Sequence, residues 1–142
     1  MAKQMFVNLP VKSLARAMKF WRAIGFKFDK EFTDENATCL VLGRNMFAML
    51  LTEKFFKSFI KKGVCNTKKG IEAITALQLG SKSEVRKLTA KALAAGAREA
   101  RKPYDYGWMY GTSFYDPDGH NWEFFFMDMK GYRAAQKKGK KK

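Results

Sequence analysis

One glutamate lies in a largely apolar stretch near the end of the chain, and its residue type suits acid–base or ligand-binding chemistry. Residues 121–127 have the sequence Asn-Trp-Glu-Phe-Phe-Phe-Met, in which Glu123 is the only charged residue. A buried carboxylate is uncommon unless it is paired, binds a metal or stays protonated. Glu123 is therefore a candidate functional residue. Exposure of Glu123 on the outer face of a strand is an equally good interpretation of the residue type.

Two strands joined by a tight turn are expected to position Glu123. Residues 108–115 are rich in aromatic residues, and residues 116–119 have the sequence Asp-Pro-Asp-Gly. Pro restricts φ, Asp bonds to nearby backbone and Gly accepts a positive φ, so this tetrapeptide predicts a turn. The only histidine, His120, has an unperturbed pKa of roughly 6.5 and is a candidate ligand or base. Because it lies three residues before Glu123, we expect it on the opposite strand face.

The rest of the chain predicts two similar modules, each with a strand, a helix and three further strands. The first covers about residues 4–52, and its helix is predicted to begin after Ser13 and end at Gly25. The second covers about residues 71–128, with a helix between Ser81 or Ser83 and Gly96. Its third strand is predicted at residues 98–102, a loop at 103–106, and a linker between the modules at 53–70.

The stretch Ser-Phe-Tyr-Asp-Pro-Asp-Gly-His-Asn-Trp-Glu-Phe, residues 113–124, resembles the C-terminal signature of the vicinal oxygen chelate superfamily. That superfamily includes glyoxalase I, bleomycin-resistance proteins and extradiol dioxygenases. Residues 6–14, Phe-Val-Asn-Leu-Pro-Val-Lys-Ser-Leu, with Lys19-Phe20-Trp21 and Gly25-Phe26, are similar to the start of the family pattern. The resemblance covers about residues 4–128, and the closest subgroup is that of predicted lactoylglutathione lyases.

This resemblance implies an α+β fold in which two βαβββ modules form a curled mixed sheet around a cleft, as one domain over residues 1–128. It also implies a homodimer, because the clefts of the family are often completed across subunits. Metal-binding members take one ligand from each of four strands. At these positions the chain has Phe6, a residue near Leu50, a residue near Ile74, and Glu123.

Only Glu123 among these positions retains a ligand type, whereas a divalent ion needs several nitrogen, oxygen or sulfur ligands. We therefore expect no metal ligands and no cofactor, although a divalent metal is left open. Lyase chemistry that polarises its substrate through a metal is put in question for the same reason.

Strand alternation and the family pattern together predict a mostly apolar cleft that binds a small molecule. Asn8 shares a strand face with Phe6, and Trp108 shares one with Tyr110, so the last two could stack on a planar ligand. Core packing is the alternative for each aromatic residue. The predicted lining consists of Phe6, Asn8, Met49, Leu51, Trp108, Tyr110, Phe114 and Glu123.

Two functions follow from this cleft. The first is metal-independent binding of a small planar or carbonyl-containing molecule. The second is a glyoxalase-type lyase or isomerase reaction in which Glu123 is the general base. Whether the protein is an enzyme is left open at this point.

The net charge indicates a possible function of a different class, the binding of polyanions. The chain has 28 Lys and Arg against 13 Asp and Glu, a net charge of +15, and five of residues 137–142 are Lys. Such a charge attracts polyanions, including nucleic acid at low salt. A solvated surface with a disordered basic tail over residues 129–142 is favoured, because no nucleic-acid recognition motif is found. An engineered cationic surface is a further alternative.

The remaining features indicate a cytoplasmic globular protein. Its 142 residues suit one domain, and no apolar run approaches the roughly 18 residues that a membrane span needs. Residues 1–5 contain no apolar signal region. Cys39 and Cys65 lack metal-like spacing and are expected to be free thiols.

Overall fold

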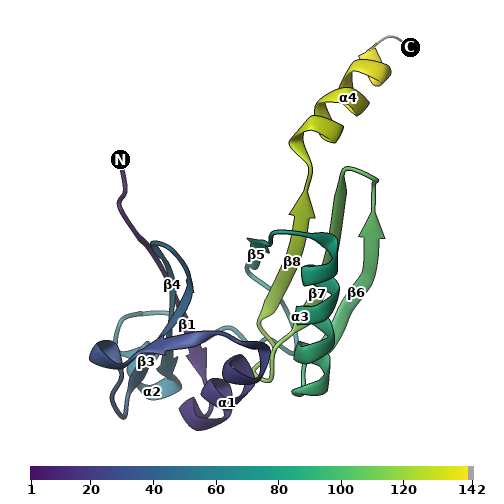
Figure 1. Cartoon of the computed structure of the whole chain (residues 1–142). Helices are drawn as coiled ribbons and strands as arrows, with labels where there is room; N and C mark the ends of the chain where they lie inside the picture. The colour runs from purple at the N-terminus through teal and green to yellow at the C-terminus, as the bar shows by residue number, and fades with distance from the viewer. Residues whose placement is uncertain (141–142) are drawn as a thin grey trace. The chain divides into compact units, whose positions relative to one another are not determined.

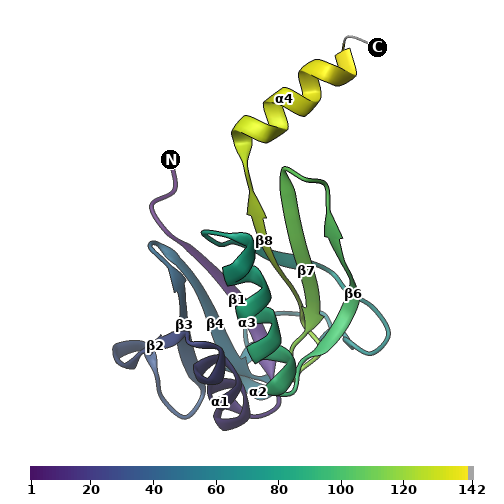
Figure 2. The same cartoon turned by 45° about the vertical axis from the view of Figure 1, so that its right-hand side comes forward.

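The computed structural model describes residues 1–140, which form two compact units (Figures 1 and 2). The first unit contains residues 1–72 together with the turn at 117–119, and the second contains the rest of the described chain. The elements of the first unit are β1 (Met5–Val11), α1 (Leu14–Ile24), β2 (Lys27–Asp29), the 3-10 helix η1 (Lys30–Phe32), β3 (Ala37–Gly43), β4 (Met46–Thr52) and α2 (Glu53–Lys57). Those of the second are β5 (Ile74–Gln78), α3 (Lys82–Ala94), β6 (Arg98–Asp105), β7 (Met109–Tyr115), β8 (Asn121–Met127) and α4 (Met129–Lys140).

The first unit is a four-stranded sheet with the order β1-β4-β3-β2, in which only β1 and β4 are parallel. Helix α1 begins where the hydroxyl of Ser13 accepts a hydrogen bond from the Arg16 N–H, at 3.2 Å. It ends at Gly25, whose φ of 114° is the left-handed conformation that glycine adopts most readily. The helix buries Phe20, Trp21 and Ile24, so one apolar face supplies much of the core of this unit.

The second unit repeats this topology, with the order β5-β8-β7-β6 and only β5 and β8 parallel. Ser81 begins α3 by accepting a hydrogen bond from the Glu84 N–H, at 3.1 Å. Figure 1 shows α3 lying along β7 and β8, and the core there includes Val85, Phe114 and Trp122. The predicted α+β class with two βαβββ modules is therefore confirmed.

Strand β6 is longer than the sequence predicts, since it continues through Pro103 to Asp105. Proline lacks a backbone N–H and is tolerated on an edge strand, and β6 is the outermost strand of its sheet. The pairing with β7 is irregular between Arg101 and Tyr104, which accommodates the proline. As a result, Tyr104 belongs to a strand and not to the predicted loop.

The prediction of a disordered tail is wrong for residues 129–140, which form helix α4. Asp128 begins the helix: its side chain accepts the Lys130 N–H at 3.1 Å, and its carbonyl accepts the Tyr132 N–H at 2.9 Å. Tyr132 then packs edge-on against Trp108, with the ring centroids 4.8 Å apart. Residues 141–142 of the predicted tail lie outside the described residues.

The turn at residues 117–119 is held within the first unit by Asp118. The carboxylate of Asp118 accepts hydrogen bonds from the Lys12 N–H at 2.9 Å and from the Arg16 guanidinium at 2.8 Å. Its carbonyl accepts the hydroxyl of Thr67 at 2.7 Å. Gly119 has a φ of 85° and leaves no room for a Cβ beside Thr67. The predicted turn is thus present and is fixed by tertiary contacts.

Both cysteines are free: Cys39 is buried and Cys65 is exposed. No helix in residues 1–140 has the length and apolar character needed to cross a membrane.

Candidate functional site

Glu123 lies on the face of the second sheet that is turned away from α3. It pairs with Ser113, and strand alternation puts both residues on the face opposite Thr112, whose hydroxyl contacts the Thr89 hydroxyl of α3 at 2.6 Å. The Glu123 side chain is half-buried. A pocket of about 320 Å³ opens there, lined by Ile74, Ala100, Arg101, Ser113, Tyr115, Asn121 and Glu123.

Tyr104 is the direct partner of Glu123 in this site. Its hydroxyl donates a hydrogen bond to the Glu123 carboxylate, and its ring lies so close over Gly111 that a Cβ there would collide with it. The Arg101 guanidinium carbon lies 4.6 Å from the ring centroid, within cation–π range. The site therefore combines a carboxylate, a phenol and a guanidinium.

The protonation state of the phenol follows from these neighbours. Burial raises the pKa of Tyr104 above its ordinary value, and the hydrogen bond to Glu123 and the Glu123 charge add to the effect. Arg101 acts in the opposite direction, with a smaller effect. Tyr104 consequently remains a hydrogen-bond donor at neutral pH.

Two further polar side chains complete the floor of the pocket. The hydroxyl of Ser113 donates to the Asn121 side-chain oxygen at 3.2 Å. Asn121 lies two residues before Glu123 on β8, so it shares the same face. The pocket thus presents donors and acceptors beside the apolar side chains of Ile74 and Ala100, and it is less apolar than the sequence predicts.

The donor set around Glu123 does not fit a divalent metal. Its neighbours in the pocket supply a phenol, a hydroxyl, an amide and a cationic guanidinium, none of which is a strong ligand for Zn, Ni or Fe. Ile74, near which the fifth-strand ligand position is predicted, lines the same pocket and offers no donor. Across residues 1–140, no three His, Cys, Asp or Glu side chains form a group able to hold a metal ion.

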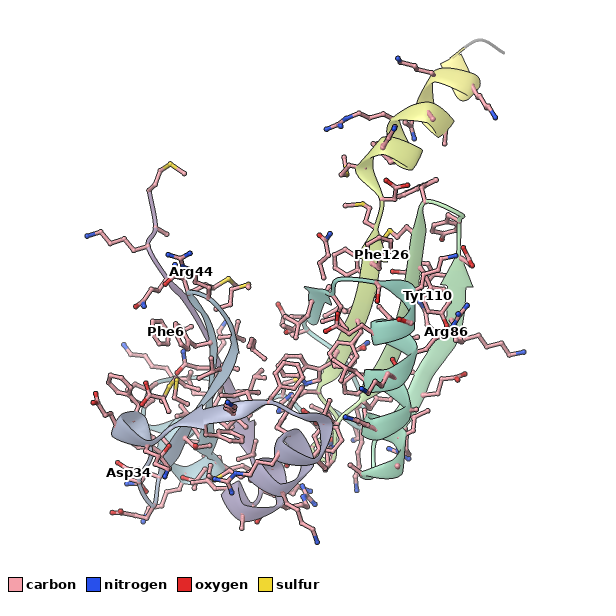
Figure 3. The ribbon with its side chains drawn as sticks, viewed as in Figure 1. Phe6, Asp34, Arg44, Arg86, Tyr110 and Phe126 are labelled. Atoms are coloured by element: carbon pink, nitrogen blue, oxygen red, sulfur yellow. The ribbon has the colours of Figure 1, made fainter. Side chains whose placement is uncertain are left out.

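The predicted placement of Tyr110 and Phe114 on one lining face with Glu123 is wrong. Both alternate to the α3 side of the sheet, where Arg86 of α3 lies beside Tyr110 (Figure 3). The Arg86 guanidinium carbon is 4.9 Å from the Tyr110 ring centroid. Phe114 is fully buried against Phe124, with the ring centroids 5.1 Å apart. Core packing, the alternative for these aromatics, explains both positions.

Trp108 lies just before β7 and contacts Tyr106 and Tyr132, and it is not among the residues that line the Glu123 pocket.

His120 follows the turn, and its backbone N–H donates to the Asp116 carboxylate at 3.0 Å. That carboxylate also accepts the indole N–H of Trp122 at 2.9 Å. The backbone of His120 therefore takes part in a structural turn, and His120 is not among the residues that line the pocket.

The predicted residues of the first unit share one face of their sheet. Phe6 pairs with Phe47 and Asn8 pairs with Met49, so alternation puts Phe6, Asn8 and Met49 on the same side, together with Leu51. Phe6 is exposed and stacks on Phe47 with a centroid separation of 4.8 Å. Asn8 is exposed and donates to the Phe6 carbonyl at 3.4 Å. Their role in ligand binding stays a prediction.

Sequence reasoning missed Tyr104, Arg101, Ser113 and Asn121. Ser113 and Asn121 could have been found, because Asn121 lies at i−2 from Glu123 and the hairpin turn sets Ser113 opposite Glu123. Tyr104 could not, because the position of its side chain depends on the irregular register beyond Pro103.

The two four-stranded βαβββ units, with a glutamate on the last strand, define a protein of the paired-module α+β type. A family model of the Glyoxalase/Bleomycin resistance protein/Dioxygenase superfamily matches residues 4–124, and the chain belongs to this superfamily.

Several solved structures have a similar fold. Hypothetical protein SA1046 from S. aureus is 25% identical with a TM-score of 0.76, covering 89% of this chain and 94% of that chain. A glyoxalase/bleomycin resistance protein/dioxygenase family enzyme from Burkholderia phytofirmans PsJN is 18% identical with a TM-score of 0.71, covering 86% and 96%. A lactoylglutathione lyase from Agrobacterium tumefaciens is 16% identical with a TM-score of 0.65, covering 89% and 94%. The comparison with curated proteins gives no match.

Proposed function

We propose that this protein binds a small carbonyl-containing molecule in the Glu123 pocket without a metal ion. The observation that carries the proposal is the Tyr104–Glu123 hydrogen bond beside the Arg101 guanidinium. A phenol and a guanidinium both donate hydrogen bonds to a carbonyl or carboxylate oxygen, and a carboxylate accepts from a hydroxyl or amide. These groups perform the orienting role that a metal would have in a metal-dependent site.

The size and lining of the pocket support a small ligand. Its volume of about 320 Å³ lies near the lower end of the range for small-molecule sites. Ile74 and Ala100 supply apolar contact, and Arg101 and Glu123 supply opposite charges at the same site. This combination favours a molecule that has a carbonyl next to a hydroxyl or amide group over a purely apolar one.

A binding screen combined with metal analysis tests this function. Protein purified without chelator is analysed for Zn, Ni and Fe, and is then titrated calorimetrically with small 2-oxo acids, hydroxyketones and aromatic amides. We expect substoichiometric metal and saturable binding of at least one compound. Near-stoichiometric metal would contradict metal independence, and the absence of binding across the panel would contradict the pocket assignment.

The matched variants are Glu123→Gln and Glu99→Gln. Both remove one carboxylate from the second sheet, but Glu99 is exposed on the edge strand and does not line the pocket. Glu123→Gln is expected to weaken binding about tenfold or more, because it removes a charged acceptor from a half-buried site. Glu99→Gln is expected to bind as the unmodified protein does.

A general-base role for Glu123 is the second candidate, and the observation that favours it is the Arg101 guanidinium in the same pocket. The carboxylate would take a proton from the carbon next to a carbonyl, while Arg101 would stabilise the negative charge that forms on the carbonyl oxygen. The Tyr104 hydroxyl would give up its hydrogen bond to Glu123 and donate its single proton to that oxygen instead. The metal-free protein should show no lyase activity on the methylglyoxal–glutathione adduct. Incorporation of solvent deuterium into a bound carbonyl compound, abolished by Glu123→Gln, would instead support the base role.

A further inference from the structure

Three aromatic rings of the β6–β7 hairpin and one of α4 follow one another in a row. The centroids of Tyr104 and Tyr106 are 5.3 Å apart, those of Tyr106 and Trp108 are 5.8 Å apart, and those of Trp108 and Tyr132 are 4.8 Å apart. Tyr106 is 60% exposed, so much of its ring is open to a further partner. This aromatic row has no part in the Glu123 pocket beyond Tyr104, and core packing does not account for Tyr106.

A second pocket of about 290 Å³ lies beside this row. Tyr106 and Trp108 line it from the hairpin, and α4 contributes Gly131, Ala134 and Ala135. The absence of large side chains on this part of α4 leaves space next to the aromatic rings for one flat group. Lys138 lines the same pocket and adds a positive charge.

The exposed surface of α4 is strongly basic. Lys130, Arg133 and Lys137 follow at spacings of three and four residues, so they share one helix face, and all three are exposed. Asp128 also lines the pocket, but its carboxylate is engaged in accepting the Lys130 N–H at the start of the helix. The pocket lining therefore carries one positive and one negative charge, and positive charge predominates on the adjoining helix face.

We propose that the aromatic row and α4 form a binding site for single-stranded nucleic acid, with a base stacked at Tyr106 and Trp108 and phosphates contacted by the α4 cations. Base–aromatic stacking next to a positively charged track is the usual means of binding single strands. A duplex keeps its bases stacked inside and could use only the cations. A membrane surface would require large exposed apolar residues on the helix. Apart from Met129 at its start, α4 has none in residues 129–139.

Fluorescence anisotropy with the full chain tests this site. The probes are a labelled oligothymidylate of about 15 nucleotides, enough for one binding site, and a duplex of the same length. We expect the single strand to bind more tightly than the duplex at equal salt. Tyr106→Ala should weaken single-strand binding about tenfold, through the loss of one stacking contact. Phe59→Ala, which truncates a 67% exposed aromatic residue of the first unit, should have no effect.

The electrostatic contribution to binding is tested by a second pair of matched variants. Lys137→Gln/Lys138→Gln should reduce the slope of log affinity against log salt by about 1.4, or about 0.7 for each lost phosphate contact on a single strand. Lys61→Gln/Lys62→Gln, an exposed pair in the first unit, should leave the slope unchanged. Equal affinity for single strand and duplex would overturn the proposal, as would equal effects of Tyr106→Ala and Phe59→Ala. Tighter association with phosphatidylserine vesicles than with the oligonucleotide would also overturn it.

Discussion

Tyr104 connects the shape of the candidate site to its chemistry. Its ring covers Gly111, and its hydroxyl reaches Glu123 from the neighbouring edge strand. The glycine is needed because any Cβ at this position would overlap the ring. The position of the Tyr104 ring therefore depends both on the absence of a side chain at Gly111 and on the hydrogen bond to Glu123.

The substitution Gly111→Ala tests the packing of the Tyr104 ring over Gly111. We expect a destabilisation of about 1–3 kcal/mol, because a methyl group is forced into occupied space. In a Tyr104→Ala background the same change should cost much less, since the overlapping ring is absent. Urea denaturation of the four proteins gives the coupling energy. Equal costs of Gly111→Ala in the two backgrounds would show that the ring does not lie over the glycine.

The pH dependence of stability tests the raised pKa of Tyr104. In the unfolded chain this phenol titrates near its ordinary value of about 10, whereas in the folded protein it holds its proton to higher pH. The folded state thus binds more protons above about pH 10, and stability falls as pH rises through that range. Relative to Tyr104→Phe, the unmodified protein should lose stability between about pH 10 and 12. Parallel curves in chemical denaturation would refute the shift.

Part of the candidate site could be predicted from the sequence. Glu123 stands out because it is a lone charge in an aromatic strand, and alternation alone puts Asn121 beside it. Tyr110 and Phe114 were expected beside Glu123, although they pair with residues of the opposite parity and pack under α3. Aromatic residue type did not distinguish a ligand-facing side chain from a core side chain, because both environments favour large apolar rings.

Among the elements, the turn at residues 117–119 is fixed by an ion pair that joins a buried carboxylate to an exposed guanidinium. The Asp118 side chain is 5% exposed and accepts two hydrogen bonds, whereas the Arg16 side chain is 46% exposed. Loss of the buried carboxylate leaves a backbone N–H and a guanidinium without their acceptor. Loss of the arginine leaves the Lys12 N–H contact intact.

We therefore predict that Asp118→Ala destabilises the protein by about 1–3 kcal/mol. Arg16→Ala should cost less than about 1 kcal/mol, because a pair with an exposed partner contributes little. Guanidinium denaturation at matched ionic strength compares the two variants. A larger cost for Arg16→Ala would contradict this account of the turn.

Helix α4 shows why element prediction from sequence was incomplete. The lysine-rich composition of residues 129–140 indicated disorder, whereas the helix is begun by Asp128 and anchored by Tyr132 on Trp108. The contact of Tyr132 with Trp108 is a tertiary one, which the composition of the segment does not reveal. The helices α1 and α3 were predictable because their capping serines and apolar spacing are local signals.

At the scale of the whole molecule, both units have the same strand order, and this repetition was predictable from strand and helix periodicity despite little sequence identity between the modules. The net charge of +15 was evident from composition, but the alignment of Lys130, Arg133 and Lys137 on one face of α4 required the helix to be known.

We also predict that the protein is a homodimer. Phe6, on the first strand, is 46% exposed, which leaves apolar surface available for association. Sedimentation velocity at micromolar concentration should give the mass of two chains, and moderate salt should be used to avoid repulsion between the cationic surfaces. A species of 16.3 kDa under these conditions would contradict the dimer.

We expect a carbonyl-containing ligand to bind at Tyr104 and Glu123 without a metal ion. The most direct test is a ligand titration of chelator-treated, ¹⁵N-labelled protein followed by backbone amide shifts, with the tightest compound from the calorimetric panel. We predict saturable shifts centred on five residues at this pocket: Arg101, Tyr104, Ser113, Asn121 and Glu123. Binding that requires added metal, or shifts centred on Tyr110 and the α3 side of the sheet, would contradict it.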